Sequence, residues 1–324
     1  MRFILLIGLA VSCWGQHRMH AVGVTTRDWV VGKPLLPGGL FVKSDSGAWA
    51  NPGHRHPYMM GLAWRPNEPG SVYLAAGNGV IRINPQGQWR ILTSYDVTEL
   101  RDISAGSDGS LLFGHTAGLR LSRDGGQSWV ELSGGLHRKY MNAVRIDRTR
   151  PQRLLAGTEE GVFVSDNAGR DWKLAGAGGF QIMHIEQSPH DAGKWLAVTQ
   201  LGGLFGSENG GLSFENVGNV GVQRNLYDIS FDATKPGRVA ICGWGPGVQI
   251  SEDGGKTWTA RNIGLPTADV WSVAFDPDHS GRLYAAVHEE ALFVSDDAGK
   301  TWRKDGLEGS IVYRMFFVPQ GGAK

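Results

Sequence analysis

The sequence contains few of the features that mark most functional classes of protein. Only 2 of its 324 residues are cysteine, and charged residues make up 19%. The net charge is +1, with Lys and Arg spread along the chain, and this distribution argues against nucleic-acid binding. There is no Gly-rich phosphate loop, Gly-x-Ser-x-Gly elbow or Cys-x-x-Cys pair. His54 and His56 alternate without a third partner nearby, which favours a surface loop over a metal site. We therefore expect no cofactor and no metal.

Long apolar runs are also scarce, and the exception lies at the N-terminus. No uninterrupted apolar stretch is long enough to span a bilayer, which argues against a membrane bundle. Arg2 precedes an apolar segment over residues 3–11, and small residues follow up to Gly15. This pattern is typical of a signal peptide, over residues 1–15, and predicts export to the periplasm or the extracellular space. A buried first strand is the alternative interpretation.

The two cysteines carry separate expectations. Residues 10–13 read Ala-Val-Ser-Cys and are similar to a bacterial lipoprotein box, although the usual Leu is missing three positions upstream of the Cys. Cys13 is therefore a candidate lipid anchor, as an alternative to simple cleavage. Cys242 lies in the apolar run 239–242. Because removal of the signal leaves it alone, we expect no intrachain disulfide and a buried, inert thiol.

What the sequence has in excess is glycine, tryptophan and repetition. It contains 48 Gly and 12 Trp. Five eight-residue segments share Ser at the first position, Asp or Asn at the third, Gly at the fifth and Trp or Phe at the eighth. They begin at Ser122, Ser165, Ser207, Ser251 and Ser295, spaced 43, 42, 44 and 44 residues apart. Two degenerate copies lie at 44–49 and 84–89. Seven copies at one period indicate a repeat fold.

The repeated segment resembles the Asp-box (BNR) repeat, and the resemblance covers essentially the whole mature chain. Its chemistry is that of a hairpin turn. The Ser hydroxyl and the Asp or Asn side chain can accept hydrogen bonds from backbone N–H groups of the turn. Gly supplies a positive φ, and the closing aromatic ring is buried between neighbouring sheets. All of these roles are structural, so the motif indicates a fold and not a reaction.

The remainder of each period reads as three further short strands, as in 153–156, 161–164 and 270–277. Four short strands per period predict one blade of a propeller. Residues 311–319 form an inner strand without partners, whereas outer strands around 29–31 and 40–42 lack an inner strand. We therefore predict an all-β, seven-bladed β-propeller with four-stranded antiparallel blades over residues 22–319. The N- and C-terminal strands together close its last blade.

In such a ring, the start of each inner strand and the turn between the second and third strands lie on one face, around the central channel. The Asp-box turns lie on the opposite face, so binding residues are expected away from the repeats. Aromatic rings, carboxylates and histidines there suit a sugar or peptide ligand. The alternative is that Tyr227, Trp271 and Tyr313 pack blade against blade. The candidate ligand-binding residues are Tyr58, Arg101, Tyr140, His184, Tyr227, Trp244, Trp271, His288, Glu289 and Arg314.

The Asp-box propellers that this sequence resembles include both enzymes and binding proteins. Sialidases have six blades and a Phe/Tyr-Arg-Ile-Pro motif, which is missing here. Xyloglucanase-type glycosidases use two tandem propellers with an acidic residue from each. In this single propeller, Asp102 and Asp228 are the candidate catalytic pair, provided that their separation suits glycoside chemistry.

Two non-enzymatic groups are also similar. Sortilin-type receptors are larger and carry Cys-rich modules. Assembly factors of the photosystem II type are single exported propellers that dock onto another protein through a basic patch. The predicted face here is mixed or acidic, so their specific partner is not carried over. We expect an exported, monomeric, non-catalytic propeller that binds a protein or carbohydrate at the channel mouth. A glycoside hydrolase, xyloglucanase-like or sialidase-like, is the alternative.

Overall fold

The computed structural model describes residues 17–26, 38–52, 55–132, 134–136, 140–218, 220 and 222–320. The predicted signal peptide, Cys13, the predicted strand around 29–31 and His54 lie outside these residues. In the described part of the chain the regular elements are all β-strands, and no helix there could cross a membrane.

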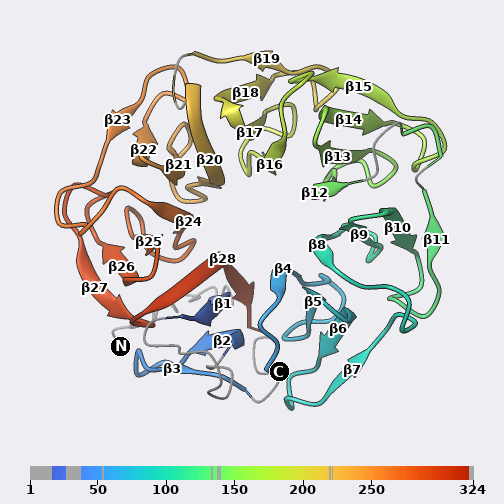
Figure 1. The fold of residues 1–324 in the computed structure, drawn as a ribbon, viewed down its shortest axis with the longest axis horizontal. Coiled ribbons are helices and arrows are strands. Elements are labelled where there is room, and N and C mark those ends of the chain that lie inside the picture. The colour runs from blue at the N-terminus through green and yellow to red at the C-terminus, as the bar shows by residue number, and fades with distance from the viewer. Residues whose placement is uncertain are drawn as a thin grey trace, which may run out of the picture.

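The strands of the described residues form seven sets of four, arranged as a ring (Figure 1). The first three sets, innermost strand first, are β4 (Met59–Ala63), β5 (Val72–Ala76), β6 (Gly79–Ile83) and β7 (Trp89–Ile91); β8 (Leu100–Ala105), β9 (Leu111–His115), β10 (Gly118–Ser122) and β11 (Val130–Glu131); and β12 (Met141–Ile146), β13 (Leu154–Thr158), β14 (Gly161–Ser165) and β15 (Lys173–Gly176). The next three are β16 (Ile182–Gln187), β17 (Trp195–Gly202), β18 (Leu204–Ser207) and β19 (Glu215–Asn216); β20 (Val222–Phe231), β21 (Val239–Trp244), β22 (Gly247–Ser251) and β23 (Thr259–Ala260); and β24 (Val270–Phe275), β25 (Leu283–Val287), β26 (Ala291–Ser295) and β27 (Arg303–Gly306). The predicted all-β propeller of four-stranded antiparallel sheets is confirmed.

The last set joins the two ends of the chain. It consists of β28 (Ser310–Pro319), β1 (His17–Thr25), β2 (Gly38–Lys43) and β3 (Trp49–Ala50), paired in that order. Strand β28 is the innermost, as predicted, and β1 pairs along nearly its whole length. Residues 17–25 take the second position, as a strand that the sequence did not predict. Residues 19–23 are buried in succession, since β1 is covered on both sides.

Two neighbouring sets are also joined by their own strands. Strand β17 runs past its partner in β16 and pairs antiparallel with the start of β20, with Gln200 opposite Asn225 and Gly202 opposite the first residue of β20. A single bridge then links Trp244 to Asp269, ahead of β24. The sets β16–β19 and β20–β23 therefore form one eight-stranded sheet.

The Asp-box turns adopt the hydrogen-bonding pattern expected from the sequence. In the turn after β10, the Ser122 hydroxyl accepts the N–H of Gly126 at 2.7 Å and donates to Asp124 Oδ1 at 2.8 Å. The same Oδ1 accepts the N–H of Ser128 at 2.9 Å. Gly125 and Gly126 have φ of 74° and 90°, which favours glycine over residues with a Cβ. The polar groups of the turn are therefore used within the turn itself.

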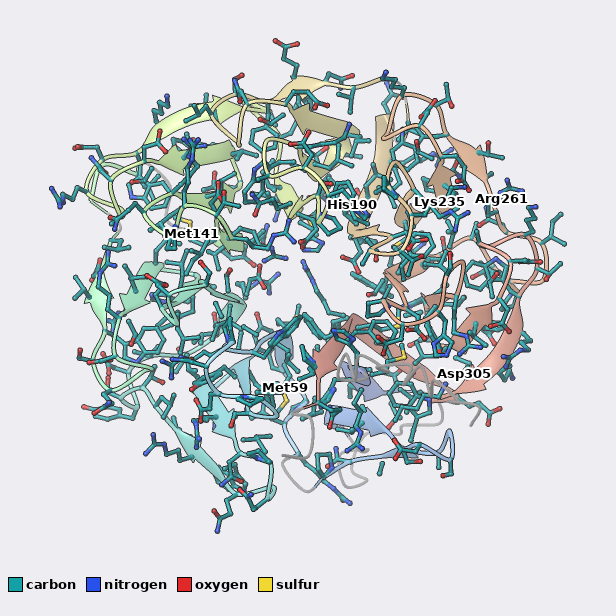
Figure 2. The ribbon with its side chains drawn as sticks, turned by 180° about the vertical axis from the view of Figure 1, so that it is seen from behind. Met59, Met141, His190, Lys235, Arg261 and Asp305 are labelled. Atoms are coloured by element: carbon teal, nitrogen blue, oxygen red, sulfur yellow. The ribbon has the colours of Figure 1, made fainter. Side chains whose placement is uncertain are left out.

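The core lies between neighbouring sheets, and the Asp-box tryptophans seal its outer edge. The indole N–H of Trp129 donates to the carbonyl of Leu92 in the preceding set at 3.2 Å. Trp302 donates in the same way to Arg261 at 2.8 Å and is 9% exposed. Figure 2 shows Arg261 and Asp305 near the outer edge of the ring, whereas Met59 and Met141, at the starts of two inner strands, lie closer to its axis.

Strand register fixes which loops share a face. Leu100, at the start of β8, pairs with His115, which precedes the turn between β9 and β10. At the other end, Ala105 pairs with Leu111, which in turn pairs with Ser122, the first residue of the Asp box. The starts of the inner strands and the Asp boxes therefore lie on opposite faces, as predicted. We name these the bulge face and the Asp-box face.

Candidate functional site

Each inner strand carries one β-bulge near its start. On β8, for example, Leu100 and Asp102 pair with consecutive residues of β9, and Arg101 is left out of the ladder. The pairings of the other six inner strands skip one residue in the same way. A bulge bends its strand and re-aims the side chain of the extra residue. The seven residues, which we call the bulge ring, are Met60, Arg101, Asn142, Met183, Tyr227, Trp271 and Tyr313.

The bulge ring surrounds a single point on the axis. All seven side chains, together with Arg314, line one cavity of about 50 Å³ at the channel mouth. One residue from each set therefore reaches the same place, although the residues differ in type. The repeat provides the position and the individual sequence provides the chemistry.

One half of the mouth is an aromatic cluster formed by Tyr227, Trp244, Trp271, His288 and Tyr313. The rings of Tyr227 and Trp271 stack at 4.3 Å with an interplanar angle of 20°. Trp244 meets Trp271 edge-on at 5.6 Å and is 38% exposed. The indole N–H of Trp271 donates to Nδ1 of His288 at 2.8 Å. Burial raises the pKa of Tyr227 and of Tyr313, so both hydroxyls stay neutral. The cluster thus presents a large, rigid and uncharged surface.

The other half of the mouth is built around Arg101. Its guanidinium lies over the rings of Tyr58 and Tyr140, at 5.8 and 5.4 Å from their centroids. It donates to Tyr58 Oη at 2.5 Å and to Asn142 Oδ1 at 3.4 Å. No carboxylate of the described residues forms an ion pair with it. The buried Nδ2 of Asn142 likewise has no hydrogen-bond partner there. Donors are therefore available to a ligand that brings acceptors.

The candidate catalytic residue Asp102 lies below the mouth and is 2% exposed. Its Oδ1 accepts the N–H of Ile103 at 2.9 Å. Its Oδ2 accepts the N–H of Val144, on the next inner strand, at 3.0 Å and the guanidinium of Arg145 at 2.6 Å. The carboxylate therefore ties β8 to β12.

Asp228 has the corresponding role three sets further along the ring. Its Oδ1 accepts the N–H of Ile229 at 3.0 Å. Its Oδ2 accepts the Ser272 hydroxyl at 2.6 Å and the N–H of Val273 at 3.2 Å. Both acceptor oxygens are used, and the contacts tie β20 to β24.

A buried ionic network fills the channel beneath the bulge ring. Arg145 contacts His184 Nε2 and donates to Glu186 Oε2 at 3.4 Å. His184 Nδ1 lies 2.6 Å from Asp228 Oδ1, and Arg314 donates to the carbonyl of Met183 at 3.1 Å. Burial opposes ionisation of Glu186, but Arg145, His184 and Arg148 together outweigh it and lower the pKa of Glu186 to about 2. His184 thus belongs to this network, one layer below the mouth, whereas Arg314 contacts the network and also lines the mouth cavity.

The remaining predicted site residue, Glu289, is exposed at the rim of the bulge face. It accepts a hydrogen bond from the Thr26 hydroxyl at 3.0 Å. The structure therefore brings Tyr58, Arg101, Tyr140, Tyr227, Trp244, Trp271, His288 and Arg314 together around the mouth. Within the described ranges, no group of three His, Cys, Asp or Glu residues is placed to hold a metal ion.

The sequence did not predict a second hollow, at the Asp-box end of the channel. Two adjoining cavities of about 360 and 390 Å³ share Trp64, Phe316, Arg145, Arg148 and Glu186 in their walls. Aromatic residues at the ends of several inner strands were a visible signal for it. The ionic network separates this hollow from the bulge ring.

Comparisons with known proteins extend this description. A sequence profile described as photosynthesis system II assembly factor YCF48 matches residues 88–321, and a search of curated proteins gave no match. Similar solved structures include a GH74 xyloglucanase from Xanthomonas campestris, at 16% identity and a TM-score of 0.65, covering 77% of this chain and 45% of that one. YCF48 from Cyanidioschyzon merolae is 18% identical in sequence, with a TM-score of 0.58, and the match covers 78% of this chain and 86% of that one. A structure of YCF48 bound to D1 peptide is 16% identical, with a TM-score of 0.58, and the match covers 82% of this chain and 91% of that one.

These structural likenesses support the propeller fold, and the chain spans less than half the length of the GH74 enzyme. The profile, by contrast, matches well over half of this chain. The chain therefore belongs to the family of the photosynthesis system II assembly factor YCF48.

Proposed function

We propose that this protein is an exported, non-catalytic propeller that binds an extended segment of a partner protein at the bulge face. The observation that carries the proposal is the bulge ring. Seven side chains, one from each set of strands, meet at one mouth, where a rigid aromatic cluster faces an arginine that has no carboxylate partner among the described residues. Exposed aromatic residues and arginine are the side chains that dominate protein-binding surfaces.

The surroundings of the mouth favour a peptide over a sugar. The cavity inside the bulge ring, at about 50 Å³, is too small for a sugar ring, so a ligand must lie across the rim. Apolar side chains stand on that rim, since Leu201 is 54% exposed and Phe180 and Trp244 are exposed as well. Membership of the YCF48 family and the similar structure with a bound D1 peptide support the same choice.

The contacts of the two candidate carboxylates argue against glycoside hydrolysis. Asp102 and Asp228 are buried, and each accepts hydrogen bonds from backbone N–H groups of the next inner strand. Such carboxylates hold sheets together and are poorly placed to protonate or attack a sugar. A glycoside hydrolase remains the second candidate, because similar solved structures include GH74 enzymes.

Export and the monomeric state complete the proposal. Export rests on the signal-like residues 1–15, with lipidation of Cys13 as the alternative to simple cleavage. Mass spectrometry of the mature protein, together with its fractionation, tests this part. A mature chain that retains Met1 and stays in the cytoplasm would contradict it.

The binding proposal can be tested with a peptide library. Peptides selected on the wild-type protein are expected to lose about tenfold in affinity for the Trp244→Ala variant, because one exposed aromatic anchor is removed. Val130→Ala, on the exposed outer strand β11, is the matched control and should bind as the wild type does. Failure to enrich any peptide whose affinity depends on Trp244 contradicts the proposal. Hydrolysis of xyloglucan by the wild type, abolished by Asp102→Asn, would favour the second candidate.

A further inference from the structure

Trp89 occupies the Asp-box tryptophan position of its repeat but is packed differently from most of its counterparts. The copy at 84–89 is two residues shorter than the full motif. Trp89 is consequently the first residue of β7 and pairs with Ile83 in the ladder. In a full-length copy, by contrast, Trp172 precedes β15 and is only partly exposed. Trp89 is 52% exposed. The shorter turn thus places a broad aromatic surface at the outer rim.

A polar groove lies beside this tryptophan on the Asp-box face. Its volume is about 440 Å³, and it runs between the sets β4–β7 and β8–β11. Arg65 fixes the floor by donating to the carbonyl of Gly109 at 2.8 Å. Arg82 donates to Glu68 Oε1 at 2.7 Å. The exposed amide side chains of Gln88 and Gln127 line the walls. The floor is therefore held by internal contacts, whereas the walls present amide groups to solvent.

The groove is lined by three arginines, Arg65, Arg82 and Arg90, and by two carboxylates, Glu68 and Asp124, which leaves one positive charge in excess. Arg82 and Arg90 are directly opposite each other in the β6–β7 ladder. The carboxylate of Glu68 is used by Arg82, Arg65, Ser71 and Tyr73. Arg90 makes no ion pair with any described residue. A ligand that brings a carboxylate would relieve this like-charge pair.

We propose that this groove is a second binding site, for an acidic sugar of the hexuronate class. A pyranose ring stacks on the exposed indole of Trp89, as aromatic side chains allow for flat apolar faces. Its hydroxyls pair with the amides of Gln88 and Gln127, and its carboxylate pairs with Arg90. The groove is large enough for one or two sugar rings. It is separate from the bulge face and does not depend on peptide binding there.

The test uses the full-length protein and tri-galacturonate as the probe, with affinity measured by calorimetry. Maltotriose has the same number of rings without carboxylates, and tri-glutamate has the carboxylates without rings. We expect tri-galacturonate to bind at least about tenfold more tightly than either. Trp89→Ala should weaken it by about tenfold, and Arg90→Gln should remove the preference over maltotriose.

The chain supplies its own control. Lys173 follows Trp172 as Arg90 follows Trp89, so Lys173→Gln removes a cation at the same repeat position of another set. It should leave binding unchanged, and thermal melting of each variant reports whether it folds. Absence of binding by the folded wild type, unchanged affinity in folded Trp89→Ala, or tri-glutamate binding as tightly as tri-galacturonate would each overturn the proposal.

Discussion

The two faces of the ring are built from the same repeat but use their polar and aromatic groups differently. On the Asp-box face, Ser122 and Asp124 bond within their own turn, and Trp129 and Trp302 pack against the neighbouring sheet. On the bulge face, one residue of each inner strand is instead left out of the ladder by a β-bulge, and its side chain points to the axis. The difference teaches that repetition fixes the fold on one face and leaves the residue type free to vary on the other.

This contrast predicts that substitutions of the buried Asp-box tryptophans change stability without changing the affinity for peptides at the bulge face. Trp302→Ala should lower the free energy of unfolding by about 3–5 kcal/mol, because it leaves a cavity between two sheets. Trp258 is less buried and donates to Gly255 within its own turn, so Trp258→Ala should cost less. Chemical denaturation measures both values. A loss of peptide affinity in folded Trp302→Ala protein would break the contrast.

In the set of strands that closes the ring, one buried histidine should make the stability of the fold depend on pH. Burial lowers the pKa of His20, on β1, from 6.5 to about 4. The unfolded chain therefore binds the proton more readily, and the stability contributed by neutral His20 is present above pH 6.5 and lost as the pH falls towards 4. Between pH 7 and pH 4, the wild type should lose about 3 kcal/mol more than His20→Gln does.

Denaturation curves across this range test the His20 prediction. His279→Gln is the control, because His279 is half-exposed on the Asp-box face. Its pH dependence should follow that of the wild type. Parallel curves for the wild type and His20→Gln would show that His20 is not the titrating group.

Asp228 is adjacent to Tyr227 of the bulge ring. A substitution there tests how far the ligand-binding residues extend below the ring and where residues that only hold the strands together begin. Asp228→Asn should lower the free energy of unfolding by about 2 kcal/mol, because it weakens charge-assisted hydrogen bonds to β24. The affinity of selected peptides should not change. If the folded variant loses affinity or a measured hydrolytic activity, the site extends below the bulge ring.

Much of this architecture could be predicted from the sequence. The Asp boxes predicted the positions of the turns, the need for glycine in them and the face on which they lie. The unpaired strand at 311–319 predicted that the two ends of the chain close the ring together. The strand at 17–25 was missed because it follows the signal-like segment directly and is buried on both sides, so its residues do not alternate. The candidate mouth residues came from loop positions alone.

What the sequence left out was the geometry of single residues. A one-residue bulge has no compositional signature here, since Met60, Asn142 and Trp271 occupy equivalent positions. The burial of Asp102 and Asp228 depends on backbone N–H groups about 42–45 residues away along the chain. Pattern reading sees residue types along one strand, whereas these contacts join neighbouring strands.

The pairing of β17 with β20, and the bridge from Trp244 to Asp269, bear on how the repeats can diverge. Main-chain bonds across these borders fix the lengths of the connecting segments on both sides. An insertion or deletion in one of the three repeats spanning β16–β27 would force a matching change in the next. Borders that are crossed by main-chain hydrogen bonds outside the strands, such as that from Glu99 to the carbonyl of Gly77, are freer to accept such changes one at a time.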